Sequence, residues 1–182
     1  SPVKLVFVHH SSGENWLDDA GGGLGLALRD NNYFVSDTNY EWGPACPACS
    51  GCGGEGAGHI GNCTDLGHWW SWFASPASST FTAALLAESE QHAWYSRRDS
   101  DPGGPNQIVM FKSCFPNSNL QGNANDPPTA AANPLRGQDC GSEAHTVGNA
   151  KGIYNEILAS FAARQDKLFV VITAPPVRDP SH

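Results

Sequence analysis

Apolar residues gather in four short runs, at residues 3–8, 33–35, 108–111 and 168–173. Each run is nearly continuous, which is typical of strands in a parallel sheet that is buried on both faces. A helix is expected over 80–97. A second helix is indicated because apolar residues recur on one helical face, at Ala150, Ile153, Tyr154, Ile157, Leu158 and Phe161. Strands that alternate with helices predict an α/β fold with a parallel sheet covered on both faces.

Polar sequences follow three of these predicted strands. They are residues 9–15 after the first strand, 112–119 after the third and 173–182 after the fourth. In parallel sheets, ligands bind beyond the carboxyl ends of the strands. The three polar sequences therefore predict a functional site at that edge of the sheet.

Composition narrows the class of protein. The chain has 182 residues, of which 40% are hydrophobic and 15% charged, and we expect residues 1–182 to form one domain. The formal charge is −8, and the 10 basic residues are scattered, so no nucleic-acid partner is expected. No apolar run is long enough to predict a membrane span. An even cysteine count with few lysines favours an oxidised, secreted protein.

Ser11 is the first candidate for chemistry. It follows the first strand at a turn into a helix, where a serine hydroxyl is well placed to act as a nucleophile. The alternative is that Ser11 and Glu14 form a capping box at the start of that helix. His9 and His10 precede Ser11, and we expect them to orient the turn or contact a substrate.

Two further residues follow the third strand. Asn117 is a candidate donor to an oxyanion, and Cys114 is a candidate nucleophile beside a histidine. The alternative is that Asn117 is a turn residue after a proline and that Cys114 is buried or paired with Cys140.

A loop over 44–63 is rich in glycine and cysteine. The spacing of Cys46, Cys49, Cys52 and Cys63 favours disulfides, with a structural metal or a redox cluster as alternatives. Beyond this loop, Trp69 and Trp70 either line a sugar-binding cleft or belong to the core.

Several longer motifs together resemble a branch of the SGNH/GDSL-type serine hydrolases. The most specific are FVHHSSGENWL at the first strand and KSCFPNSN at the third, with IGNCTDLGHWW between them. The resemblance covers nearly the whole chain and implies a flavodoxin-like three-layer α/β/α fold. It also implies that Ser11 is the nucleophile, with His9 and His10 where other members have Gly and Asp. Gly61, or alternatively Gly43, and Asn117 would donate to the oxyanion.

The same resemblance implies a late D-x-x-H motif. Asp179 and His182 match that form and are the candidates for the acid–base pair. In the family the motif follows a fifth strand, whereas here it follows the fourth. The alternative is therefore that the base lies beyond residue 182 and that the domain lacks its C-terminal part.

These observations predict a secreted serine esterase that needs no cofactor. Its substrate would be an acyl ester, such as an acetyl group on a small molecule or a polysaccharide, with His10, Trp69 and Trp70 as substrate-binding candidates. The alternative is a non-catalytic structural or glycan-binding protein on the same scaffold. A third, weaker alternative is a metal-dependent protein that uses the four loop cysteines.

Overall fold

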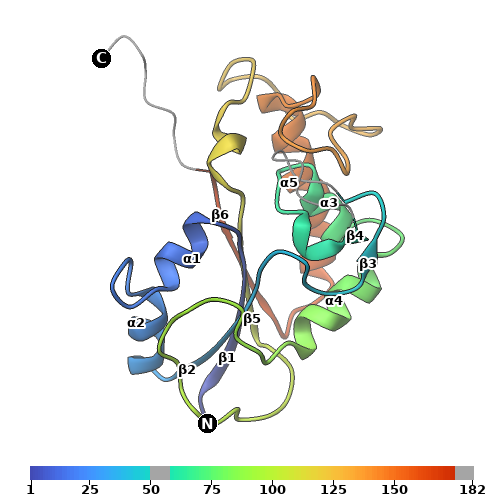
Figure 1. Cartoon of the computed structure of the whole chain (residues 1–182). Coiled ribbons are helices and arrows are strands. Elements are labelled where there is room, and N and C mark those ends of the chain that lie inside the picture. Colours follow the sequence, from blue (N-terminus) through green and yellow to red (C-terminus); the bar gives the residue numbers. More distant parts are fainter. Residues whose placement is uncertain (50–57, 175–182) are drawn as a thin grey trace.

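The computed structural model describes residues 1–49 and 58–174 and shows an α/β fold (Figure 1). Its main sheet has four parallel strands in the order β2-β1-β5-β6. The strands are β1 (Val3–Val8), β2 (Tyr33–Thr38), β5 (Ile108–Lys112) and β6 (Leu168–Ile172). The four predicted apolar runs are confirmed as strands, and the predicted parallel sheet is confirmed with them.

Helices cover both faces of the sheet (Figure 1). One face packs against α1 (Ser12–Leu17) and α2 (Leu24–Asp30), and the other packs against α3 (His68–Phe73), α4 (Ser78–Ala87) and α5 (Val147–Ala162). In β1, for example, Val6 and Val8 belong to the α3–α5 side of the core, whereas Leu5 and Phe7 belong to the α1–α2 side. This alternation explains why apolar residues occupy consecutive positions in the strands, since neighbouring residues face opposite sides of the core.

Helix α4 is shorter than the sequence predicts. The expected helix over 80–97 ends at Ala87, and the backbone of Glu88 is extended. The Glu88 carboxylate accepts hydrogen bonds from the backbone N–H groups of Ser89 and Glu90 and from Trp42 Nε1. These contacts hold the chain in a turn, so the polar segment that follows runs over the sheet instead of continuing the helix.

Short elements complete the fold. The loop over 44–63 contains a two-stranded ribbon, β3 (Ala45–Cys46) and β4 (Gly58–His59), and the 3₁₀ helix η1 (Ile60–Asn62). A second 3₁₀ helix, η2 (Phe115–Ser118), follows β5. Both η1 and η2 carry residues that the sequence marks as site candidates. No helix in the described part of the chain is long and apolar enough to cross a membrane.

Candidate active site

Ser11 lies in the turn between β1 and α1, at the carboxyl edge of the sheet. Its side chain is exposed, and Oγ lies 3.4 Å from the hydroxyl of Tyr40. The backbone φ of Ser11 is 39°, a left-handed conformation that costs a non-glycine residue on the order of 1–3 kcal/mol. The Ser11 side chain makes no capping hydrogen bond with α1, so the alternative of a capping box is wrong. The hydroxyl therefore faces solvent from a strained turn.

His9 lies beneath this turn and is fully buried. Its Nε2 is 2.9 Å from Asp37 Oδ2, and Asp37 Oδ1 accepts a hydrogen bond of 2.9 Å from the Tyr95 hydroxyl. Burial, together with the Asp37 carboxylate, raises the pKa of Tyr95, so that this hydroxyl remains a donor. A Cβ at Gly13 would lie 2.4 Å from the His9 Cβ. His9 therefore supports the turn from inside and needs the glycine above it.

His10 is also buried, and both of its ring nitrogens are engaged. Nε2 donates to the Gly61 carbonyl, which can only accept, and Nδ1 therefore accepts from the Thr64 hydroxyl at 3.0 Å. Burial lowers the pKa of His10 to about 4, so the ring is neutral near pH 7. Its face stacks on Tyr40 with ring centroids 3.9 Å apart. His10 thus orients the turn but has no free nitrogen to serve Ser11 as a base.

The structure connects the two predicted oxyanion donors to this histidine, but it also gives each donor a protein acceptor. The Gly61 N–H donates to the Trp42 carbonyl at 2.9 Å, and the Asn117 side-chain amide donates to Asp65 Oδ1 at 2.5 Å. In the described part of the chain, the Ser11 backbone N–H donates to no protein acceptor. Of these three donors, the Ser11 N–H is therefore the one that can donate to an oxyanion without first breaking a hydrogen bond to a described residue.

Asp65 and His68 were not singled out from the sequence. The Asp65 N–H donates to His68 Nδ1 at 3.1 Å, and the Leu66 N–H donates to Asn117 Oδ1 at 2.8 Å. Burial lowers the pKa of His68, which favours the neutral ring that this hydrogen bond requires. These contacts join the segment between η1 and α3 to the start of α3 and to η2, and so hold these segments in place relative to one another. Only the spacing Asp-x-x-His at residues 65–68 could have signalled them.

A second polar cluster lies beside the Ser11 turn, and it joins Cys114, a candidate from the sequence, to Lys112 and Ser12, which the sequence did not single out. Lys112 Nζ lies 2.6 Å from Ser12 Oγ and 3.7 Å from Cys114 Sγ. In the sequence, Lys112 is an ordinary polar residue at the end of a strand. Its neighbour in space, Ser12, is 100 residues away along the chain, so no local pattern links the two. Cys114 carries a free thiol, so the alternative pairing of Cys114 with Cys140 is wrong.

The two tryptophans proposed for substrate binding lie in different surroundings. Trp69 is fully buried in the core, and its Nε1 donates to Ser113 Oγ at 2.8 Å. It therefore contributes to packing and does not line an open cleft. Trp70 is half-buried, and the Arg136 guanidinium lies over its ring at 5.5 Å from the centroid.

The loop cysteines gather in the core. The sulfurs of Cys46, Cys49 and Cys63 all lie within 4.8 Å of one another, and Cys49 is placed as a disulfide partner of both others. Because one sulfur forms only one disulfide, the cluster can hold one bond and one thiol. Cys140 is also disulfide-bonded. Cys52 lies outside the described residues.

An apolar hollow of about 260 Å³ adjoins Asn117 at the carboxyl edge. It lies between η2, α5 and the end of β6, and the Tyr154 hydroxyl at its wall has no hydrogen-bond partner among the described residues. Burial raises the pKa of Tyr154 to about 12. The hollow offers an apolar surface at the edge of the sheet where the candidate site lies.

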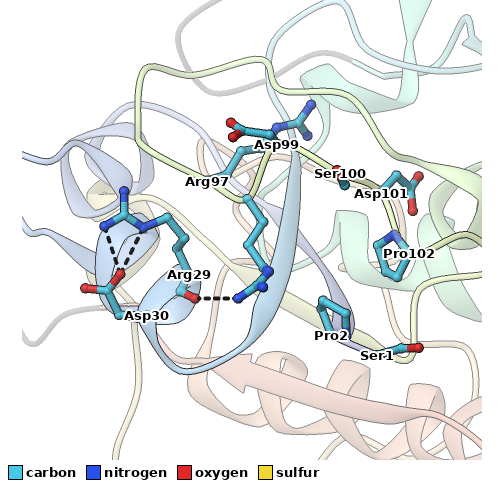
Figure 2. A pocket seen from close by; sticks show the side chains of 10 residues that line it. Ser1, Pro2, Arg29, Asp30, Arg97, Asp99, Ser100, Asp101 and Pro102 are labelled. Carbon is cyan, nitrogen blue, oxygen red and sulfur yellow. Dashed lines mark hydrogen bonds and ion pairs between the residues drawn. The ribbon is translucent and has the colours of Figure 1, made fainter.

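A larger hollow of about 790 Å³ lies at the opposite end of the sheet (Figure 2). It is lined by the N-terminal residues before β1, the end of α2 and the segment 97–102. Three of the charged residues that line it form ion pairs: Arg29 with Asp30 at 2.8 Å, and Asp101 with Lys4 at 2.9 Å. Parallel sheets bind ligands at their carboxyl edge, so this hollow is not part of the candidate site.

Asp179 and His182, the predicted acid–base pair, lie outside the described residues. Among the described residues, no histidine contacts Ser11 Oγ. Comparison of the chain with protein-family models, curated proteins and solved structures gave no match. The α/β fold and the contacts at the carboxyl edge are therefore the basis for assigning a function.

Proposed function

We propose that the protein is a secreted serine esterase of SGNH type that hydrolyses acyl esters, with Ser11 as its nucleophile. The observation that carries the proposal is the Ser11 turn, which presents an exposed hydroxyl from a left-handed backbone directly after the first strand of a parallel sheet. Strained residues of this kind cluster at functional sites. The cysteine cluster in the core supports an oxidising compartment.

In the proposed reaction, Ser11 Oγ loses its proton to a base and attacks the carbonyl carbon of the ester. On the resemblance, the base is His182 oriented by Asp179. The Ser11 N–H donates to the oxyanion. The Asn117 amide becomes a second donor when it gives up its hydrogen bond to the Asp65 carboxylate and donates to the substrate oxygen instead. The alcohol leaves with the proton from the base, and water then attacks the acyl-enzyme to release the acid and restore Ser11.

The proposed substrate class is inferred from the hollow and the exposed side chains at the carboxyl edge of the sheet. The hollow beside Asn117 is mostly apolar and, at about 260 Å³, has room for a short acyl group. Tyr40, which is 38% exposed next to Ser11 and stacks on His10, is an aromatic side chain that the alcohol part of the ester can contact. Acetyl esters of a sugar or a polysaccharide combine these two features.

The test is hydrolysis of 4-nitrophenyl acetate and of an acetylated polysaccharide, followed as acetate released. Ser11→Ala should lower kcat/KM, and by on the order of a thousandfold or more where Ser11 supplies the only covalent route, because removing the nucleophile removes that route. Ser100→Ala is the matched control, since Ser100 is exposed at the other end of the sheet and should keep wild-type activity. Equal hydrolysis by the wild type and Ser11→Ala rules out this role for Ser11.

A second candidate is a non-catalytic glycan-binding protein on the same scaffold. It is favoured by the engagement of the Gly61 and Asn117 donors and by the absence of a histidine contact to Ser11 among the described residues. Under this alternative, neither substrate is hydrolysed. Calorimetric titration with the same polysaccharide then gives binding that survives Ser11→Ala.

A further inference from the structure

Lys112 is a buried lysine without a carboxylate partner among the described residues. Its exposed fraction is 1%. Within residues 1–49 and 58–174, its Nζ contacts Ser12 Oγ, Cys114 Sγ and the face of the Trp16 ring, whose centroid is 5.4 Å away. Lys4 provides the contrast, because it is equally buried but pairs with Asp101 at 2.9 Å. An ammonium group with no counter-charge is costly to bury, so the environment of Lys112 favours the neutral amine.

Burial accordingly lowers the pKa of Lys112, and the nearby Cys114 thiol opposes this only in part. The titratable groups that face Lys112 are Cys114 and, from the β1 turn, His10. His10 is held neutral by its own burial, so it supplies no charge that would fix the state of the amine at neutral pH. A neutral amine has a lone pair that can accept the proton of a hydroxyl.

The hydroxyl next to that lone pair belongs to Ser12. Strands β1 and β5 are adjacent and parallel, with Val8 opposite Phe111, so the residues that follow them meet at the carboxyl edge. Ser12 Oγ lies 2.6 Å from Lys112 Nζ, within the range for proton transfer, and the side chain of Ser12 is partly exposed. Ser11 Oγ, by contrast, lies near the Tyr40 hydroxyl and contacts no amine of the residues that the structure describes.

The geometry points to a serine–lysine dyad in which Lys112 is the general base for Ser12, so that Ser12 is a second nucleophile at this edge, independent of Ser11. The assignment rests on the proposed function only for its substrate class, acyl esters. Other hydrolases activate a serine with an amine in the same way, without a histidine or a metal.

The proposed reaction uses only Lys112, Ser12, the ester and water. Lys112 Nζ takes the Ser12 proton as Oγ bonds to the acyl carbon, and the ammonium then returns the proton to the departing alkoxide. In the second half, Lys112 takes a proton from water, the hydroxide attacks the acyl carbon, and Ser12 Oγ leaves and recovers the proton. The sum is ester plus water giving acid plus alcohol.

The test uses a biotinylated fluorophosphonate on the full chain. Attack by Oγ forms an O–P bond, expels fluoride and leaves the proton on the base. Tandem mass spectrometry with electron-transfer fragmentation assigns the adduct to Ser11 or to Ser12. We expect an adduct on Ser12 whose rate of formation falls about a hundredfold or more in Lys112→Arg, because the guanidinium stays protonated at every assay pH.

Lys4→Arg is the matched control, since it changes a buried lysine at the opposite end of the sheet and should leave the Ser12 adduct unchanged. If Lys112→Arg does not fold, the pH profile of the wild type replaces it. An inflection in the Ser12 rate below the ordinary lysine pKa of about 10.4 supports the dyad, whereas a rate that simply follows hydroxide concentration overturns it.

The labelling result separates this inference from the proposed function. An adduct on Ser11 alone, or on neither serine, overturns the dyad, and an unchanged Ser12 rate in folded Lys112→Arg does so too. The role of Ser11 is judged separately by ester hydrolysis with Ser11→Ala. A Lys112-dependent adduct on Ser12 supports the dyad even if that hydrolysis assay excludes Ser11.

Discussion

The contact between Gly13 and His9 allows a sharp test of the β1–α1 turn. In Gly13→Ala, the new Cβ would lie 2.4 Å from His9 Cβ and 2.8 Å from His9 Cγ. Ordinary carbon contacts are about 3.5–4.0 Å, so one side must move by more than about 1 Å. His9 has little freedom to move, because its side chain is fully buried and its Nε2 is bound to Asp37.

The magnitude has two opposing parts. Replacing glycine by alanine in a helix gains about 1 kcal/mol of stability, because the unfolded alanine chain has fewer states to lose. Overpacking a site that cannot relax costs about 1–3 kcal/mol, and the closeness of this contact puts the cost at the upper end. The net effect expected for Gly13→Ala is a loss of about 2 kcal/mol in the free energy of unfolding.

Urea denaturation followed by tryptophan fluorescence measures this loss. Gly141→Ala is the control, because Gly141 is exposed and its nearest contact is the flexible carboxylate of Asp139 at 3.2 Å. That variant should unfold within about 0.5 kcal/mol of the wild type. A Gly13→Ala protein that is as stable as the wild type, or more stable, refutes the account of the turn given above.

Three further predictions concern residues around the site. As the pH falls from 6.5 to about 4, the free energy of unfolding should fall by up to about 3 kcal/mol through His10. Burial lowers the pKa of His10, so in this range the unfolded chain binds a proton that the folded ring does not. Urea denaturation at several pH values should show a weaker pH dependence of stability in His10→Gln. Trp72→Phe should cost about 1–3 kcal/mol, because the buried Cys63 carbonyl loses the donor that lies 2.6 Å away; thermal unfolding measures the change, and an unaltered melting temperature contradicts it. Cys114 is free and partly exposed, so iodoacetamide should alkylate it without a reductant; peptide mapping that leaves Cys114 unmodified in the native protein counts against this placement.

Much of the sheet could be predicted from sequence because its strands are buried on both faces. Each of the four apolar runs became a strand, and the period over 150–161 became α5. Helix α4 could not be delimited in the same way. Its early end depends on the Glu88 carboxylate, which meets the indole N–H of Trp42 only after the chain has folded.

For the candidate site, the sequence located the carboxyl edge but not the partners within it. Ser11, His10, Gly61 and Asn117 were singled out, and the structure links the last three through the segment that contains Thr64 and Asp65. Lys112 and Ser12 were missed, because no local pattern relates positions 100 residues apart. Trp69 was left open between cleft and core, and its complete burial decides for the core.

The sequence by itself thus determined the class of fold and the edge of the sheet where polar residues collect, because hydrophobic periodicity is a local property of the chain. The tertiary structure decided which polar groups meet there and in what protonation state. Burial and hydrogen-bond partners set these properties, as in the neutral ring of His10 and the buried amine of Lys112, which has no carboxylate partner in the described part of the chain. Both depend on which strands become neighbours, and this is known only once the chain has folded.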